Sequence, residues 1–254
     1  MQIVIITIIF IFGMVIGSFF NVLGYRLPKK ESIVFPSSHC PNCQHKLKFF
    51  DLFPVLSYLF LKGKCRYCNV KISPIYPLIE LLTAILFVIS YLVFGFSMDF
   101  LIAIIFSSIT VITIVTDIRY MIIEDSVLIV GGIIILALSI INTGITETIS
   151  MIINGVLSFI LIYLIKLAAD FSFKKEAMGG GDVKLMFLIG IMNGFSMTFV
   201  TLCMASFIAF PYAIYIYLSK NDNILPLGPF LCIAALIVYF SGITFNDLMN
   251  IMSN

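Results

Sequence analysis

Charged residues are scarce in this chain of 254 residues: Asp, Glu, Lys and Arg make up 11% of it, whereas hydrophobic residues make up 61%. A soluble domain carries about 25% charged residues, and the mean hydropathy of +1.15 is far above that of such a domain. The composition excludes a soluble globular protein. It predicts an all-α polytopic membrane protein, because its apolar runs have the length of membrane-spanning helices.

Several catalytic motifs are also missing. No serine lies in Gly-x-Ser-x-Gly, no His-Glu-x-x-His motif is present, and His39 and His45 both lie outside the long apolar runs. No Gly-x-Gly-x-x-Gly follows a strand, so no Rossmann-type site is expected. A basic patch interleaved with aromatic residues is absent as well, which gives no reason to expect a nucleic-acid partner.

Eight apolar runs are candidates to cross a lipid bilayer, which takes about 20 residues. The first has no basic residue before it and no small-residue cleavage site, so we expect a retained span rather than a signal peptide. The sixth is short. The runs are Ile3–Leu23, Leu78–Phe96, Phe100–Thr116, Ser126–Ile141, Ser150–Ala168, Leu185–Phe195, Thr198–Leu218 and Leu227–Phe245.

The basic residues indicate the orientation. Nine of the 15 Lys and Arg lie between Arg26 and Lys71, where only Glu31 and Asp51 oppose them. Because Lys and Arg gather on the cytoplasmic side, the segment 26–77 should be cytoplasmic. Eight crossings then place every basic residue in the cytoplasm and leave acidic residues but no base in the opposite loops. We therefore expect both termini outside the cytoplasm.

The segment 26–77 is predicted to be a small domain held by a metal. It contains Cys40-Pro-Asn-Cys43 and Cys65-Arg-Tyr-Cys68, two Cys-x-x-Cys pairs separated by 21 residues. This spacing is typical of a structural zinc site, and zinc supplies folding energy that a core of about 50 residues lacks. Disulfides are the alternative, which a reducing cytoplasm disfavours. Residues 1–25 would then form the first span and residues 78–254 a membrane domain of seven helices.

The other candidate ligands have simpler interpretations. Four cysteines already fill a closed tetrahedral site, so His39 and His45 are expected to be solvated loop residues. Cys203 and Cys232 lie in apolar runs without a partner motif, and we expect them to be buried thiols.

The stretch Met178–Leu185, which reads Met-Gly-Gly-Gly-Asp-Val-Lys-Leu, places a carboxylate between two apolar runs. Gly179, Gly180 and Gly181 are expected to break the helix and expose bare peptide. Because burying Asp182 in hydrocarbon costs about 3 kcal/mol, it is a candidate functional residue. Asp117, where the third run ends, should lie at the same cytoplasmic depth.

Two neighbouring carboxylates in a site of low polarity suit hydrolysis. One is expected to hold a proton and to polarise a peptide carbonyl, while the other takes a proton from water. Each aspartate alone could instead be solvated at the end of a span. Asp125 also begins an apolar run, and a favourable interaction with the helix N-terminus explains it better than catalysis. Arg119 and Lys184 could tune these charges, but anchoring at the cytoplasmic side explains both.

Several signatures occur in one order along nearly the whole chain, and with them the sequence resembles the bifunctional prepilin peptidases, or type IV leader peptidases, which are membrane aspartic proteases with a Gly-x-Gly-Asp motif. Asp117 resembles the first catalytic aspartate of that family, and the stretch Gly179–Asp182 resembles its second motif. The remaining signatures are Gly17–Val22, Tyr25–Pro28, the two cysteine pairs enclosing Pro54–Tyr58, Ile72–Ser73, Tyr76–Leu81 and Pro226–Phe230.

The resemblance implies eight helices in the bacterial cytoplasmic membrane, a cytoplasmic zinc domain and two activities. One activity is cleavage of the basic leader of type IV prepilins or pseudopilins after a glycine. The other is methylation of the new terminal residue, usually Phe, with S-adenosylmethionine as donor. The chain departs from the family at Glu124-Asp125, where Pro-Asp is common, so we expect a different entry into that helix with the catalytic pair intact.

The methyl-donor site has no familiar motif. Gly63 permits close backbone approach, and Asn21, Arg26 and Glu80 lie where the loop meets the membrane, so these four are candidates. Packing or loop geometry is the favoured explanation for each of them. Two other functions stay open: a peptidase without methylation, and a cation transporter in which the aspartates bind an ion at broken helices. The chain shows no internal repeat that would favour the transporter.

Overall fold

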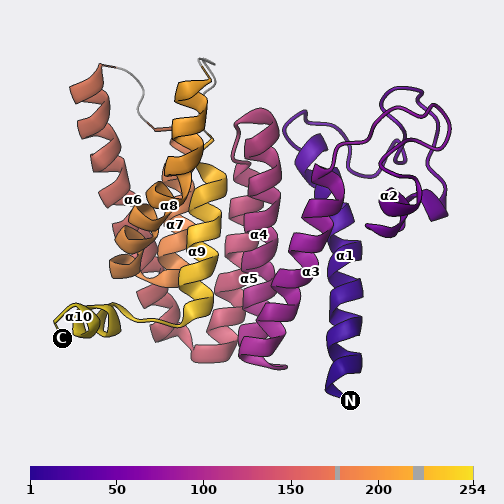
Figure 1. The fold of residues 1–254 in the computed structure, drawn as a ribbon. Coiled ribbons are helices and arrows are strands. Elements are labelled where there is room, and N and C mark those ends of the chain that lie inside the picture. Colours follow the sequence, from indigo (N-terminus) through magenta and orange to yellow (C-terminus); the bar gives the residue numbers. More distant parts are fainter. Residues whose placement is uncertain (175–177, 220–225, 254) are drawn as a thin grey trace. The chain divides into compact units, whose positions relative to one another are not determined.

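The computed structural model describes residues 1–174, 178–219 and 226–253 and consists mainly of helices (Figure 1). Lys175 and Lys220, two of the basic residues used for the orientation, lie outside the described residues. The chain forms two compact units, Met1–Arg119 and Tyr120–Asn254. Each unit has its own packed helices.

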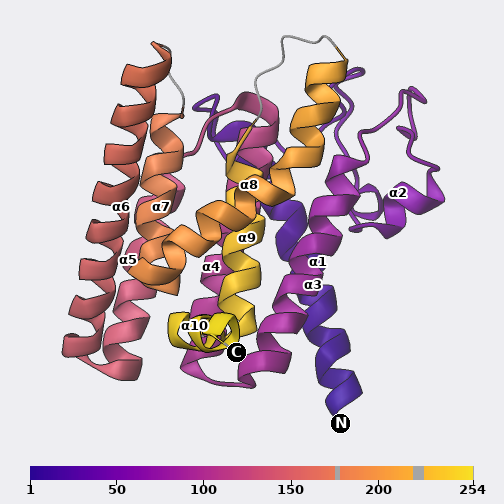
Figure 2. The ribbon, with the colours of Figure 1, turned by 60° about the vertical axis from the view of Figure 1, so that its left-hand side comes forward.

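The first unit is built on a close pair of helices, α1 (Gln2–Arg26) and α3 (Ile75–Phe94), which lie side by side in Figures 1 and 2. Gly13 and Gly17, four residues apart, lie at their contact. A Cβ at Gly13 would come within 2.6 Å of the Cα of Ala84. Small residues at this spacing let two membrane helices approach closely.

The third long helix of this unit, α4 (Met98–Tyr120), completes an apolar cluster with the first two. Ile9 of α1, Phe87 of α3 and Phe100 of α4 are the buried residues of this cluster. Tyr91 packs its ring edge-on against that of Phe100, with centroids 6.1 Å apart. The cluster lies near the start of α1 and α4, the end away from the loop.

The connection between α1 and α3 forms the cysteine domain. It has little regular structure: a 3-10 turn, η1 (Phe49–Asp51), a short helix, α2 (Leu56–Phe60), and two isolated β-bridges, His39–Lys46 and Lys64–Lys71. This connection lies between the first two long helices of the chain, and its role as a separate zinc domain stays a prediction.

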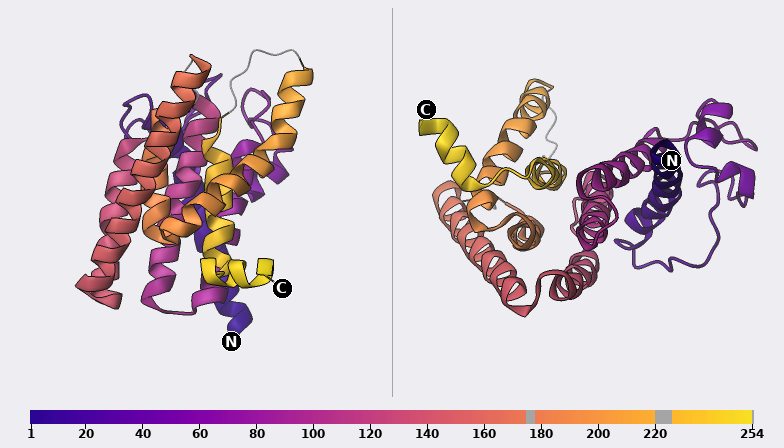
Figure 3. Two further views of the ribbon diagram at one scale, coloured as in Figure 1. Left: turned by 90° about the vertical axis from the view of Figure 1, so that its left-hand side faces the viewer. Right: turned by 90° about the horizontal axis from the view of Figure 1, so that it is seen from below.

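In its described residues the second unit contains six further helices, which are α5 (Asp125–Thr143), α6 (Ile145–Phe173), α7 (Gly180–Asn193), α8 (Phe195–Leu218), α9 (Gly228–Ser241) and α10 (Phe245–Ser253). Gly144 and Gly194 have positive φ values of 91° and 81°, which end one helix and allow the next to begin at once. The views in Figure 3 show α5, α6 and α7 running alongside one another.

Two details shape this unit. A Cβ at Gly155 of α6 would lie within 2.7 Å of Ile191 of α7, so these helices pack closely. Pro211 lies inside α8, where it removes a backbone hydrogen bond, and Figure 2 shows α8 bent.

Each of the eight predicted spans overlaps one long helix, α1 or α3 to α9, but the second span runs past the end of α3 at Phe94 and the sixth past the end of α7 at Asn193. Six helices of the described chain are long and apolar enough to cross a membrane. The sixth and eighth predicted spans correspond to α7 and α9, which have 14 residues each and are about 21 Å long. The last span was expected to reach Phe245, but α9 ends at Ser241. The all-helical fold is confirmed, whereas the count of eight spans and the three-part domain division stay predictions.

Candidate functional site

The four cysteines of the loop come together in one cluster. Their sulfur atoms all lie within 4.8 Å of one another, and the sulfurs of Cys40 and Cys68 are 3.8 Å apart. A tetrahedral zinc ion with Zn–S bonds of about 2.3 Å needs sulfur atoms about 3.8 Å apart. All six cysteines of the chain lie among the described residues, and each is a free thiol. The donor set and its size therefore fit a structural zinc ion.

Both cysteine pairs use the same turn. The N–H of Gln44 donates to the carbonyl of Cys40, and the N–H of Asn69 donates to the carbonyl of Cys65 in the same way. Gln44 and Asn69 both have φ of 57°, a left-handed conformation that turns the chain back after the second cysteine. The sequence spacing thus creates two equivalent turns, each presenting two thiols on one side.

The thiols influence one another strongly. The backbone N–H of Val70 lowers the pKa of Cys68 to about 6, with further hydrogen bonds from Asn42 and two other thiols. The N–H of His45 lowers the pKa of Cys43, but desolvation and hydrogen bonds with the other three thiols raise it to about 11. Four thiolates this close repel one another, and a divalent cation is what would hold all of them ionised.

Asp51 connects η1 to the second cysteine turn. Its carboxylate accepts hydrogen bonds from the N–H of Lys48 at 3.1 Å and from Nε of Arg66 at 2.7 Å. Burial alone would raise the pKa of Asp51, but these two partners outweigh it and hold the pKa below its usual value. The ring of Tyr67 packs on that of His45, with centroids 3.6 Å apart. Arg66 and Tyr67, the two residues between Cys65 and Cys68, thus fasten the second turn to the rest of the domain.

Asp182 lies in the first turn of α7 and is buried, with 9% of its surface exposed. Gly179 precedes the helix in an extended conformation, and Gly180 and Gly181 are its first two residues. The glycines therefore form a helix start rather than a break within a helix. A Cβ at Gly179 would lie 3.2 Å from Oδ2 of Asp182, whereas no described atom lies within 4 Å of a Cβ at Gly180. A Cβ at Gly181 would lie 3.0 Å from Ile123, so of the three glycines Gly180 is the one beside open space.

Asp117 lies in the last turn of α4 and is 6% exposed, although the next two residues are exposed. The guanidinium of Arg119 lies 5.2 Å from the centre of the Tyr25 ring, a cation–π contact with α1. Both candidate aspartates are thus buried at the ends of their helices. Asp117 belongs to the first unit and Asp182 to the second, so their pairing stays a prediction.

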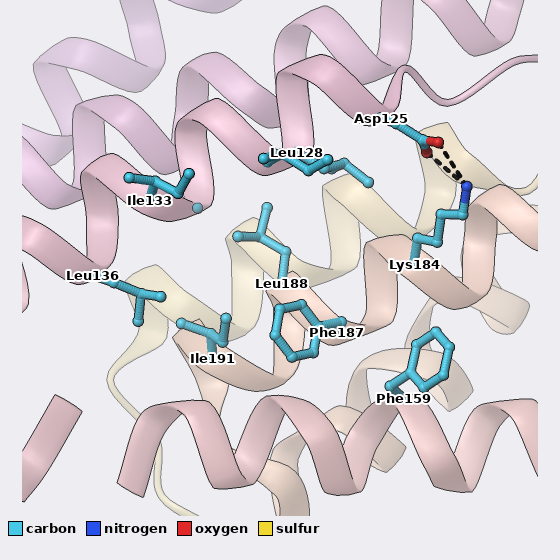
Figure 4. Close-up of a pocket in the computed structure, with 11 residues that line it drawn as sticks. Asp125, Leu128, Ile133, Leu136, Phe159, Lys184, Phe187, Leu188 and Ile191 are labelled. Carbon is cyan, nitrogen blue, oxygen red and sulfur yellow. Dashed lines mark hydrogen bonds and ion pairs between the residues drawn. The ribbon is translucent and has the colours of Figure 1, made fainter. Parts of the chain in front are cut away.

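Asp125, the third candidate carboxylate, differs from both. It is the first residue of α5, and Nζ of Lys184 donates to both of its oxygens at 2.8 Å (Figure 4). Both side chains are about half exposed. Lys184 therefore interacts with Asp125, and the preference for a helix-start role over catalysis agrees with this exposed ion pair.

A cavity of about 470 Å³ extends from this ion pair between α5, α6 and α7. Figure 4 shows Leu128, Phe159 and Leu188 pointing into it, and apart from the ion pair its walls are apolar. Asp182 is not among the described residues that line it. The cavity is therefore not the site of the candidate carboxylates.

The four methyl-donor candidates have different surroundings. Nδ2 of Asn21, which is 3% exposed, donates to the carbonyl of Tyr76, while its Oδ1 has no hydrogen-bond partner among the described residues. Arg26 donates to the carbonyls of Ser32 and Pro36, so it shapes the start of the loop. Asn21 thus has an acceptor oxygen available for a ligand, whereas the guanidinium of Arg26 is already engaged by two backbone carbonyls.

Glu80 and Gly63 both hold the region around α2. The carboxylate of Glu80 accepts a hydrogen bond of 2.7 Å from the N–H of Val55, directly before α2. Gly63 has φ of 68°, and a Cβ there would lie 2.9 Å from the hydroxyl of Tyr58. These contacts give both residues a part in the loop geometry, and a role for them at the methyl-donor site stays a prediction.

Comparisons with known proteins agree with this arrangement. The Bacterial Peptidase A24 N-terminal domain matches residues 11–94, and the Type IV leader peptidase family matches residues 104–214. A protein of Bacillus subtilis (strain 168) named prepilin leader peptidase/N-methyltransferase is 32% identical over 240 residues, covering 93% of this chain and 94% of its own length. The chain belongs to the type IV leader peptidase family.

Two further members of the family show the same end-to-end match. The prepilin leader peptidase/N-methyltransferase of Vibrio cholerae is 32% identical over 254 residues, covering 95% of this chain and 98% of its own. A type 4 prepilin-like proteins leader peptide-processing enzyme of Escherichia coli O78:H11 is also 32% identical, covering 88% and 89%. No solved structure gives a significant match. Family membership makes this protein an enzyme and confirms the resemblance noted from its motifs.

Some contacts in this leader peptidase were not predicted from its sequence. The stacked rings of Tyr25 and Tyr76, with centroids 5.1 Å apart, join α1 to α3 beside Arg119. Arg66 and Tyr67 lie between Cys65 and Cys68 in the sequence, and this position could have indicated that they contact the rest of the cysteine domain. The spacing of Gly13 and Gly17 was a further signal of close helix packing.

Proposed function

We propose that this protein removes the leader of type IV prepilins or related pseudopilins, with Asp117 and Asp182 as its catalytic pair. The protein then methylates the new N-terminal residue with S-adenosylmethionine as donor. The single observation that carries the proposal is the match over more than nine-tenths of the chain to relatives named prepilin leader peptidase/N-methyltransferase. The burial of both aspartates at helix ends supports the choice of residues.

The proposed location is the bacterial cytoplasmic membrane, which the apolar helices cross several times. We propose that α4 ends, and α7 begins, at the cytoplasmic face, so that the two carboxylates act there and both termini lie outside. The gathering of basic residues in the cysteine domain supports this orientation. The basic leader of a prepilin would then reach the aspartates from the cytoplasm.

The chemistry follows from the residue types. In the proposed reaction one aspartate, ionised, takes a proton from water as it attacks the peptide carbonyl. The other, protonated, donates a hydrogen bond to the carbonyl oxygen, where negative charge develops. The first turn of α7 contributes backbone N–H groups that have no partner within the helix and favour an ionised carboxylate. No covalent intermediate is needed.

We propose that Cys40, Cys43, Cys65 and Cys68 hold a structural zinc ion. Bound zinc would join the two turns and supply folding energy to a domain with a small core. Asn21 is the methyl-donor candidate that the contacts favour, since its buried Oδ1 could accept a hydrogen bond from the donor's ammonium group. Arg26, Gly63 and Glu80 would support that site by holding the loop and α2 in place.

Mass spectrometry of a co-expressed prepilin tests the proposal. Intact prepilin should become a mature pilin that has lost its leader and gained 1 methyl group on its N-terminus. Leader loss without the methyl group would show a peptidase alone. If the prepilin stayed unprocessed although the protein was present in the membrane, the proposal would be contradicted. Ion transport by the two aspartates would then be the next function to test.

A matched pair of variants makes this experiment specific. Asp182→Asn removes the buried carboxylate, whereas Asp125→Asn removes the exposed one that binds Lys184. The first should leave the prepilin uncleaved and the second should cleave it. An equal loss of cleavage in both variants would mean that the catalytic role of Asp182 is wrongly assigned.

A further inference from the structure

The short helix α2 is tied to the membrane helices well inside their ends. The N–H of Val55, directly before α2, donates to Glu80, the sixth residue of α3. Ser18 of α1 also hydrogen-bonds to Glu80 and lies eight residues before the end of that helix. With a rise of 1.5 Å per residue, Glu80 is about 8 Å from the start of α3 and Ser18 about 12 Å from the end of α1.

The position of α2 in the first unit agrees with this tie. In Figures 1 and 2, α2 lies beside α1 and α3, level with part of their length, rather than beyond the ends that carry the loop. The hydroxyl of Tyr58 donates to the carbonyl of Ile72 and secures the helix from its other side. For helices that span a bilayer, a position about 8–12 Å inside their ends corresponds to the depth where the hydrocarbon meets the headgroups.

The surface of α2 and of the residues before it is strongly apolar. Phe60 is 81% exposed, Phe50 is 74% exposed and Leu59 is 64% exposed, and Phe53 and Leu56 are also exposed. We call these five residues the apolar ledge. An exposed patch of this kind on a soluble domain marks an interaction surface, because burying each such apolar side chain away from water is favourable.

Basic residues stand next to the apolar ledge. Lys62, Lys64 and Arg66 follow α2 directly, and Lys48 comes shortly before it; all four are exposed. Asp51 is the acidic residue of this region, and it is engaged by Arg66. Aromatic and aliphatic side chains beside lysines are typical of helices that lie in the interface of a membrane with anionic lipids.

We propose that the apolar ledge inserts into the cytoplasmic interface of the membrane and anchors the cysteine domain there. The ledge occupies the boundary between headgroups and acyl chains, and the neighbouring lysines bind anionic lipid phosphates. Depth, apolar exposure and charge point to the same occupant, which is lipid. Insertion buries apolar surface that the domain cannot bury in its own small core, so the bilayer contributes to its stability.

The chain suits a direct test, because it contains no tryptophan. A Phe60→Trp variant of the full-length protein therefore carries 1 fluorescent indole, placed on the apolar ledge. After reconstitution into vesicles of phosphatidylcholine and phosphatidylglycerol, its emission should shift to the blue. Lipids brominated high on the acyl chain should quench it strongly, and more than lipids brominated near the chain end, since interfacial helices insert about 5–10 Å.

The matched control is Lys46→Trp, at an exposed residue of the first cysteine turn that is not part of the ledge. Its emission should stay that of an indole in water, with little quenching. Leu59→Trp gives a second position on the ledge if Phe60→Trp fails to match the parent in circular dichroism and gel filtration. Replacing phosphatidylglycerol with phosphatidylcholine should weaken the quenching at the ledge.

Two results would overturn the proposal. In the first, the indole at position 60 behaves like the one at position 46 in every vesicle. In the second, the indole is shielded only when a prepilin is added, which would show that the ledge binds protein. Neither result depends on whether the protein cleaves prepilins, because the measurement follows the indole alone.

Discussion

The cysteine domain and the helices that carry the candidate aspartates position their reactive groups in different ways, the first by short local turns and the second by burial at helix ends. The four thiols belong to two short turns with the same backbone hydrogen bonds, and they meet within 4.8 Å. Asp117 and Asp182 are each buried at an end of an apolar helix, 65 residues apart along the chain. With zinc bound as proposed, the thiols would stabilise the fold of their own domain, whereas the carboxylates depend on a fold that other residues stabilise.

The largest effect should come from the helices. Asp182→Asn removes a buried carboxylate and should lower cleavage of a prepilin in membranes by about 10³-fold, within the range of general acid–base catalysis. Asp125→Asn, the exposed counterpart at the start of a neighbouring helix, should change cleavage only a few-fold. The measurement is the rate of leader removal by gel shift. Comparable losses in the two variants would break the distinction between buried and exposed carboxylates.

The next effect belongs to the cysteine domain. Cys65→Ser removes 1 thiolate from a closed site, and the domain should unfold because zinc contributes about 10 kcal/mol in comparable small sites. Methylation should be lost, whereas cleavage should fall only in part, since the aspartate chemistry does not require the metal. Metal content, leader loss and methylation should be measured on one prepilin.

Two outcomes would contradict this account of the cysteine domain. Zinc retained at 1 ion per chain would show that the thiols are not its ligands. Methylation unchanged after zinc loss would show that the methyl-donor site does not depend on the domain. The control is Cys203→Ser, a thiol outside the cluster that should change neither activity.

Packing of the membrane helices should give a moderate effect. Gly13→Ala places a methyl group against the backbone of α3 at Ala84 and should lower the free energy of unfolding by about 1–3 kcal/mol. Gly132→Ala, where the nearest atom is 3.8 Å away, should be neutral or stabilise α5 by up to about 1 kcal/mol. Thermal unfolding in detergent compares the two. Equal destabilisation would mean that the contact of α1 with α3 is looser than described.

The smallest effect should come from the exposed ion pair. Asp125 and Lys184 are both about half exposed, so their attraction is screened by water and salt. Lys184→Gln should change the free energy of unfolding by less than about 1 kcal/mol. The measurement is thermal unfolding at low and high salt. A decrease of several kcal/mol in the free energy of unfolding would contradict this expectation and show that the pair stabilises the start of α7.

Much of this arrangement could be predicted from the sequence. The apolar runs predicted a helix at each of eight places, because hydropathy over about 20 residues is a strong local signal. The cysteine cluster followed from two Cys-x-x-Cys pairs, since the geometry of a zinc site is contained in that spacing. The bounds of the last span were wrong, because Gly242 adopts a left-handed conformation and ends α9 early.

The remaining features depend on contacts between distant parts of the chain. The sequence did not reveal that Lys184 would bind Asp125, 59 residues away, because both have ordinary roles at a membrane surface. The three glycines before Asp182 predicted a helix break, but their conformation at the start of α7 depends on where α6 ends. The pairing of Asp117 with Asp182 rests on topology and on family membership, and spacing along the chain does not specify it.

The most direct test of the central claim uses Asp117→Asn, Asp182→Asn and the double variant on one prepilin. Because the two carboxylates are proposed to act as a unit, each single variant should abolish nearly all cleavage, and the double variant should lose little more. The measurement is the initial rate of leader removal in membranes with equal amounts of enzyme. Near-normal cleavage by either single variant, or losses that multiply in the double variant, would contradict the proposal that Asp117 and Asp182 form the catalytic pair.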